Sequence, residues 1–128
     1  MAFREIEIRK GVKIILGKDA KSNDELMKKY EGKENKIVHT VAPGSPFCVI
    51  DASDPSKKDV KNASGACAYY SQDWRDNKQD TTVNVFTGKD ISKTKGMKPG
   101  TWKVSKSKKI VIKKRKIERV GDVTSKNS

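Results

Sequence analysis

The sequence lacks any long hydrophobic run. A membrane-spanning helix needs about 18 consecutive apolar residues, and no such run occurs in the 128 residues. The N-terminal stretch MAFREIEIRK carries charges where a secretory signal peptide needs an apolar segment. These absences exclude a membrane-spanning chain, and we expect a soluble cytoplasmic protein that has no membrane partner.

Metal ligands and nucleophiles are also scarce. The two cysteines, Cys48 and Cys67, lie inside apolar stretches without the spacing of a metal site. We therefore expect two reduced, buried thiols rather than a disulfide. His39 is the only histidine, and one histidine with two buried cysteines does not make a ligand set. The sequence predicts no metal site and no cofactor.

Positive charge, in contrast, is abundant and unevenly placed. The formal net charge is +13, while hydrophobic residues make up only 34% of the chain. Residues 89–128 contain 14 Lys and Arg against 3 Asp and Glu, so this last third carries +11 of the total. Such a charge opposes compaction unless a polyanion screens it, and it favours nucleic acid or an anionic surface as partner.

Hydrophobic periodicity predicts a small α+β domain. Alternating residues indicate a hairpin over 3–16, and the pair Ser22 and Glu25 is typical of a capping box that starts a helix at Asn23 and continues to Tyr30. A longer helix is predicted from an Asp54-Pro55 cap to about residues 75–77, because apolar residues recur every three or four positions.

Further strands are predicted around KIVHTV, PFCVID, TTVNVFTG and TWKV. A last strand is predicted in KKIVIKKRKI, and residues 113–116 form its end. The expected architecture is a single compact domain over residues 1–116, with a mostly antiparallel sheet and two helices. Residues 117–128 are polar, and we expect them to form a disordered tail.

Several segments, in this order, resemble one family. They are GVKIILGKDAKSNDEL, VHTVAPGS, ASGACAYYS and VNVFTGKDISKTKGMKPG, followed by the lysine-rich closing strand. Together they resemble NFACT-R, the RNA-binding domain of the NFACT proteins of ribosome-associated quality control, which also occurs in small stand-alone proteins. The similarity covers about residues 11–113. Pro46 departs from the pattern, since a second histidine often follows the Pro-Gly-Ser turn in that family.

The resemblance implies RNA binding in a translation setting, with tRNA or ribosomal RNA, and the ribosome itself, as candidate partners. Lysines are expected to bind phosphates without strong sequence preference, while the Gly17–Asn23 turn and the loop after His39 add local contacts. The candidate RNA-binding residues are Lys18, Asn23, His39, Gly44, Ser45, Lys93, Lys95, Lys98, Lys103, Lys108, Lys109, Lys113, Lys114, Arg115 and Lys116.

Three alternatives stay open at this point. A nucleotide-processing or RNA-modifying enzyme would place its site at His39, Ser45 and Asp24, but a general base needs an orienting partner that the sequence does not reveal, so we expect a protein without enzymatic activity. The same charge would also suit DNA or an anionic membrane surface. His39 is as compatible with a packed residue at a strand end as with an RNA contact.

Overall fold

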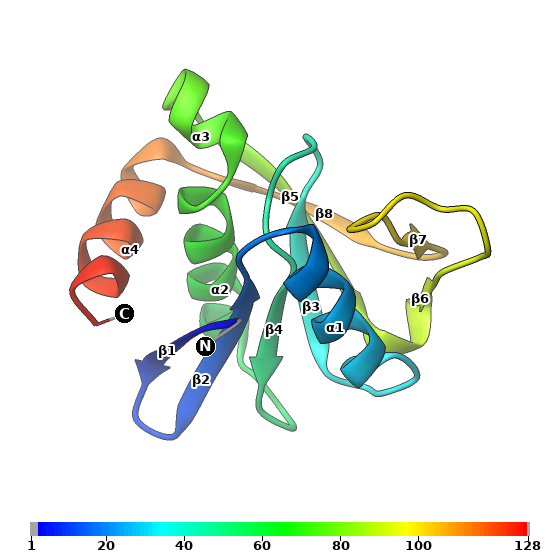
Figure 1. Cartoon of the computed structure of the whole chain (residues 1–128). Helices are drawn as coiled ribbons and strands as arrows, with labels where there is room; N and C mark the ends of the chain where they lie inside the picture. The colour runs from blue at the N-terminus through cyan, green and yellow to red at the C-terminus, as the bar shows by residue number, and fades with distance from the viewer. Residues whose placement is uncertain (1–2, 128) are drawn as a thin grey trace.

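The computed structural model describes residues 3–127 and contains eight strands and four α-helices in one domain (Figure 1). The strands are β1 (Phe3–Arg9), β2 (Val12–Gly17), β3 (Lys36–Thr40), β4 (Cys48–Asp51), β5 (Thr81–Thr87), β6 (Ile91–Ser92), β7 (Lys103–Val104) and β8 (Lys108–Ile112). The helices are α1 (Ala20–Tyr30), α2 (Lys57–Tyr69), α3 (Gln72–Asn77) and α4 (Lys114–Asn127), with a short 3₁₀ turn at Gly88–Asp90.

Six strands form one sheet in the order β1-β2-β4-β3-β5-β8, and each neighbouring pair is antiparallel. The predicted hairpin over residues 3–16 is confirmed, since β1 pairs with β2. β6 and β7 make a separate two-stranded ribbon. The predicted class, α+β with a mostly antiparallel sheet, is therefore confirmed.

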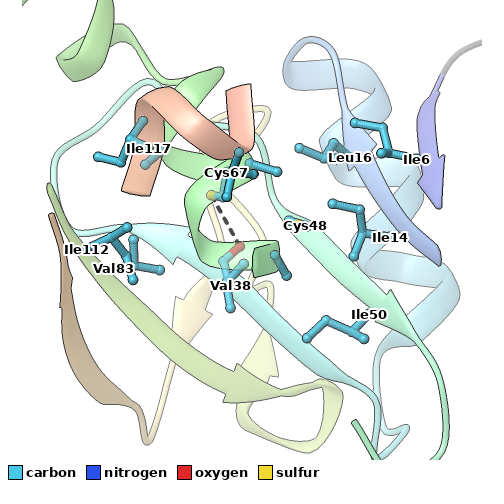
Figure 2. Close-up of a cluster of buried hydrophobic side chains, with 14 of the residues drawn as sticks. Ile6, Ile14, Leu16, Val38, Cys48, Ile50, Cys67, Val83, Ile112 and Ile117 are labelled. Carbon is cyan, nitrogen blue, oxygen red and sulfur yellow. Dashed lines mark hydrogen bonds between the residues drawn. The ribbon is translucent and has the colours of Figure 1, made fainter. Parts of the chain in front are cut away.

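Helices α2 and α4 cover one face of the sheet (Figure 1). All six strands contribute buried side chains to the core beneath them, from Ile6 on β1 to Ile112 on β8. Both cysteines lie in this core as free thiols, as predicted. Figure 2 shows the Sγ atom of Cys67 pointing toward the carbonyl oxygen of Val38, at 3.7 Å. Burial raises the pKa of the Cys67 thiol to about 12, so it stays protonated and unreactive.

Helix α1 and the β6–β7 ribbon pack on the opposite face. Their core includes Leu26 and Met27 from α1, Phe86 from β5, and Trp102 from the segment that leads into β7. Side chains of neighbouring strand residues point to opposite faces. Accordingly, Ile37 belongs to this core and Val38 to the core under α2.

The first helix starts earlier than predicted. Asp19 is the N-cap: its carboxylate accepts the Ser22 N–H, and the Ser22 hydroxyl accepts the Asp19 N–H, at 2.8 and 3.0 Å. Ser22 is thus the third helical residue of a capping box rather than its cap. The sequence signal was real but was placed three residues too late.

The predicted long helix is in fact two helices. Ser56, not Asp54, caps α2, and its hydroxyl accepts the Asp59 N–H at 3.0 Å. Ser71 then separates α2 from α3, because its hydroxyl donates to the Ala68 carbonyl and accepts the Trp74 N–H. One side chain therefore ends the first helix and starts the next.

The prediction of a disordered tail over residues 117–128 was wrong for the described part, and so was the placement of residues 113–116 on a strand. The strand β8 ends at Ile112, and α4 follows at Lys114. Asp80, 34 residues earlier, accepts the Lys114 N–H at 2.8 Å and caps the helix. Ile117 and Val120 are buried against α2. Gly121 allows a close approach, since a Cβ there would lie 2.1 Å from the Tyr69 ring.

Candidate nucleic-acid interface

A groove of about 760 Å³ opens at the end of the sheet where β2 and β3 terminate. The turn into α1, the β3–β4 loop and α3 all lie at this end, the upper one in Figure 1. The groove brings together five of the predicted site residues, namely Lys18, Asn23, His39, Gly44 and Ser45. These residues come from two segments that are about 20 positions apart in the sequence.

The turn between β2 and α1 forms one wall of the groove. Gly17 is needed there because a Cβ would lie 1.9 Å from the Oδ1 atom of Asn23. That same Oδ1 accepts the Phe47 N–H at 3.1 Å, so Asn23 joins α1 to the start of β4. Asn23 therefore has a structural role in this turn, while Lys18 is exposed at the rim.

His39 lies in the opposite wall, half-buried at the end of β3. Its ring packs against Phe47 with the ring centroids 4.5 Å apart, and its Nδ1 is 2.7 Å from the Thr40 carbonyl oxygen. Burial lowers the pKa of His39, although backbone hydrogen bonds with Thr40 and Ser45 partly oppose this shift. The imidazole is consequently neutral at pH 7, and it presents an aromatic surface rather than a charge.

Ser45 and Gly44 complete the β3–β4 loop. The Ser45 hydroxyl is buried, accepts the Thr40 N–H at 3.1 Å and donates to the Pro46 carbonyl at 3.2 Å. These bonds hold the loop closed and leave the hydroxyl in a structural role. Gly44 is exposed, and its carbonyl accepts the Gln72 N–H at the start of α3.

Asp24 on α1 fixes the β6–β7 ribbon beside the groove. Its Oδ1 accepts three hydrogen bonds: from the Lys93 ammonium at 2.8 Å, from the Trp102 indole at 2.9 Å and from the Gly100 N–H at 3.0 Å. Burial raises the pKa of Asp24, but these hydrogen bonds outweigh it and the net pKa is lowered. The Trp102 ring is buried in this arrangement and is not available for stacking on a base.

The predicted basic residues outside the groove differ in their exposure. Lys93 is held by Asp24 and by the carbonyls of Lys98 and Thr101. Lys116 is half-buried, and its ammonium donates to the Asn62 side chain. The remaining eight are exposed on the ribbon, on β8 and on the first turn of α4: Lys95, Lys98, Lys103, Lys108, Lys109, Lys113, Lys114 and Arg115.

Sequence reasoning missed part of the groove. Arg4, Tyr70 and Arg75 line it, and the Arg4 guanidinium lies 4.1 Å from the centroid of the Tyr70 ring. Asn84 on β5 lines it as well. These four residues come from β1, the end of α2, α3 and β5, and no local pattern connects them. Only the pairing of β1 with β2 and the break at Ser71 bring them to the same end of the sheet.

The residues named for the enzymatic alternative have other partners. The Ser45 hydroxyl bonds to backbone groups, and the Asp24 carboxylate bonds to the ribbon. Within residues 3–127, no group of three or more His, Cys, Asp or Glu side chains is placed to hold a metal ion. Every helix in that range is too short or too polar to cross a bilayer.

The fold of this chain is also found in a solved structure. A search of curated proteins finds no match. Among solved structures, the C-terminal part of the fibronectin/fibrinogen-binding protein from Streptococcus suis matches with a TM-score of 0.78 and 26% identity. The match covers 92% of this chain but only 48% of the other, so the present chain spans about half of that structure.

The family comparison covers most of the molecule. Residues 2–106 match the NFACT protein RNA binding domain, and the matched range includes the whole groove and the ribbon but ends before β8 and α4. The general role that this family supports is RNA binding. On this evidence the chain belongs to the family of NFACT RNA-binding domains.

Proposed function

We propose that this protein binds tRNA or ribosomal RNA in the cytoplasm, in the setting of translation and ribosome-associated quality control, and that it acts without catalysing a reaction. Its partner there would be the ribosome or a tRNA on it. The observation that carries the proposal is the +11 charge of residues 89–128 on a domain of an RNA-binding family.

The chemistry of the exposed cations supports backbone contacts over base readout. Eight of the predicted basic residues are exposed on the ribbon, on β8 and at the start of α4; seven of these eight are lysines, and one is Arg115. A lysine ammonium is a point charge that attracts phosphate, whereas specific base recognition usually relies on bidentate side chains such as arginine. We therefore expect binding that depends on the shape and charge of the RNA more than on its sequence.

The first test is the salt dependence of affinity. If several lysines contact phosphates, log K for tRNA should fall with log salt by about 0.7–0.9 for each contact. The measurement is fluorescence anisotropy with labelled tRNA at several salt concentrations. An affinity that does not change with salt would refute the electrostatic mechanism.

The second test is charge reversal. Replacing Lys113, Lys114 and Arg115 by Glu should weaken tRNA binding by about tenfold or more. The matched control reverses three exposed lysines from the first 40 residues, Lys10, Lys28 and Lys29. Equal losses in both variants would show that the C-terminal cations have no special role, and thermal melting would verify that both variants fold.

The third test separates binding from the remaining alternatives. His39→Ala should change RNA affinity by no more than about tenfold, which is the scale of one hydrogen bond or contact, whereas it would abolish turnover if His39 were catalytic. Competition among tRNA, duplex DNA and anionic vesicles at physiological salt ranks the partners. A clear preference for DNA or vesicles would contradict the proposal.

A further inference from the structure

The pairing of the strands extends the lining of the groove along one face of the sheet. His39 on β3 is paired with Asn84 on β5, and Asn84 with Lys109 on β8. Directly paired residues point to the same face, so these three side chains form one row across three strands. The row lies on the α1 face, because His39 has the same orientation as Ile37, two residues earlier.

The next row toward the end of the sheet is apolar and exposed. Thr82 is paired with Val111, and the Val41 N–H donates to the Thr82 carbonyl. Val41 is 47% exposed and Val111 is 56% exposed. On the same face, the row of Ile37 and Phe86 is covered by α1 and the ribbon and is buried. The cover therefore decreases toward this end of the sheet: His39 and Asn84 are half-buried, whereas Val41 and Val111 are exposed.

Cations surround this surface on two sides. Lys18 and Arg75 are exposed at the groove, Arg4 lies half-buried beside Tyr70, and Lys109 stands in the row of His39. The groove lining contains a single acidic residue, Asp19, whose carboxylate accepts the Ser22 N–H. A ligand that combines a flat apolar body with negative charge matches this arrangement.

Asn84 adds a hydrogen-bonding group to the same wall. Its Oδ1 atom is buried and has no partner within residues 3–127. A rotation of the amide about χ2 would turn either its donor or its acceptor end toward the groove. The edge of a nucleobase carries both donors and acceptors, so it can satisfy such an amide in either orientation.

We propose that the groove and the last two rows at this end of the sheet form a subsite for an unpaired RNA nucleotide. The base lies against the wall of His39, Val41 and Asn84, and the flanking phosphates meet Lys18, Arg75 and Lys109. The groove volume of about 760 Å³ falls within the range of about 300–1,000 Å³ found for small-ligand sites. This inference rests on the proposed RNA-binding function and adds that single-stranded RNA binds at a defined place.

The test compares an RNA hairpin with a blunt stem and the same hairpin with a single-stranded 3′ extension of four uridines. For the wild-type protein, the extension should tighten binding by at least about fivefold, which is the low end of the effect of stacking one base. Val41→Glu places a negative charge on the wall and should return this ratio toward one. Val41→Ser removes the apolar contact without adding charge, and should lower the ratio less.

The matched control is Val123→Glu. Val123 is as exposed as Val111, but it lies on α4, on the other side of the sheet. This variant should keep the wild-type ratio. The subsite is refuted if Val41→Glu and Val123→Glu change the ratio equally. It is also refuted if the extension gives no gain in affinity for the wild-type protein while the blunt hairpin still binds. In both cases the proposed RNA-binding function stands. If neither RNA binds, the proposed function itself fails.

A second measurement uses the fact that His39 is the only histidine. Its imidazole C–H signals in the proton NMR spectrum are therefore assigned without further work. Titration with a short oligouridylate should shift these signals and saturate together with binding measured by anisotropy. Unshifted imidazole signals at saturation would overturn the placement of the base.

Discussion

The two faces of the sheet are covered to different extents, although the same strands form both. Under α2 and α4, buried side chains come from all six strands, and the core continues to the edge strand β8. Under α1 and the ribbon, the core includes no residue of β8, and Val41 and Val111 at the end of the sheet stay exposed. Both faces therefore have a buried core, but only the core under α2 and α4 extends across the whole sheet, and the other face leaves surface for a ligand.

The largest effect is expected on the closed face. Ile117→Ala should lower the free energy of unfolding by about 2–5 kcal/mol, because the side chain is fully buried between α4 and the rest of the core. Chemical denaturation followed by circular dichroism measures it. Val123→Ala, at an exposed position of the same helix, should change stability by less than about 0.5 kcal/mol. A small effect of Ile117→Ala would mean that α4 does not support the core.

The second effect concerns the link between α2 and β1. Asp59 is buried and accepts two hydrogen bonds from Arg9, at 2.7 and 2.9 Å, which lower its pKa from 3.8 to about 2. The ionised Asp59 carboxylate contributes on the order of 2 kcal/mol to the free energy of unfolding. This contribution is present above about pH 4 and is lost as the pH falls from about 4 to 2.

Denaturation midpoints between pH 6 and pH 2 measure this contribution. Asp59→Asn should flatten part of the acid limb of the stability curve. Asp51→Asn alters an exposed carboxylate and serves as the control. An unchanged acid limb in the Asp59 variant would contradict the assigned role of the ion pair.

The third effect tests the cover of the open face. Asp24→Asn removes the negative charge that holds Lys93. The free energy of unfolding should fall by about 1–3 kcal/mol, because a half-buried ammonium loses its charged partner. Amide hydrogen exchange should increase specifically in residues 91–104. Glu25→Gln removes the same charge from the neighbouring exposed position on α1 and should leave the ribbon protected. Equal exchange in the two variants would show that Asp24 does not hold the ribbon.

The smallest effect comes from His39. Its pKa is lowered by burial from the ordinary value of 6.5, so the folded state binds a proton less readily than the unfolded state. Stability that is present above pH 6.5 should therefore decrease as the pH falls below this value. The measurement is the difference in melting temperature between pH 7.5 and pH 5.5, which should become smaller in His39→Gln. A difference that His39→Gln leaves unchanged would assign the pH dependence to other groups.

Much of the fold was predictable because its signals are local. Alternation in FREIEIR and VKIILG indicates a hairpin, and β1 and β2 form it. The apolar residues of α2 recur at helical spacing, and the helix packs these residues against the core. The paired stretches around KIVHT and TTVNVFT also became neighbouring strands. In each case one segment carries enough information for its own conformation.

The errors have two different origins. The helix α4 was missed because its cap, Asp80, lies 34 residues away, so no capping residue precedes the run KKRK. The spacing of Ile117, Val120 and Thr124 was the available signal, since all three are buried on one side of the helix. Ser71 was missed as a helix boundary for a different reason: its partners, Ala68 and Trp74, are local, but the apolar spacing continues past it to Trp74.

The candidate site was predictable only in part. The Gly17–Asn23 turn and the loop after His39 were identified from the sequence, and both line the groove. The lysines were also identified, but the sequence could not assign them to faces. Lys108 and Lys109 illustrate this point, because adjacent strand residues point to opposite sides of the sheet. Only the register with Asn84 places Lys109 in the same row as His39, one strand beyond Asn84.

The sequence by itself determined the fold class and the kind of partner. A strongly positive chain with one histidine, two buried thiols and alternating strands favours a small α+β protein with a polyanionic partner. The tertiary structure alone decided where the binding surface lies. Strand pairing depends on contacts between distant segments, and a shift of one residue would turn His39 and Lys109 to the other face. Helix α4 closes one face of the sheet and the ribbon stops short on the other, so the surface left open is a property of the packing.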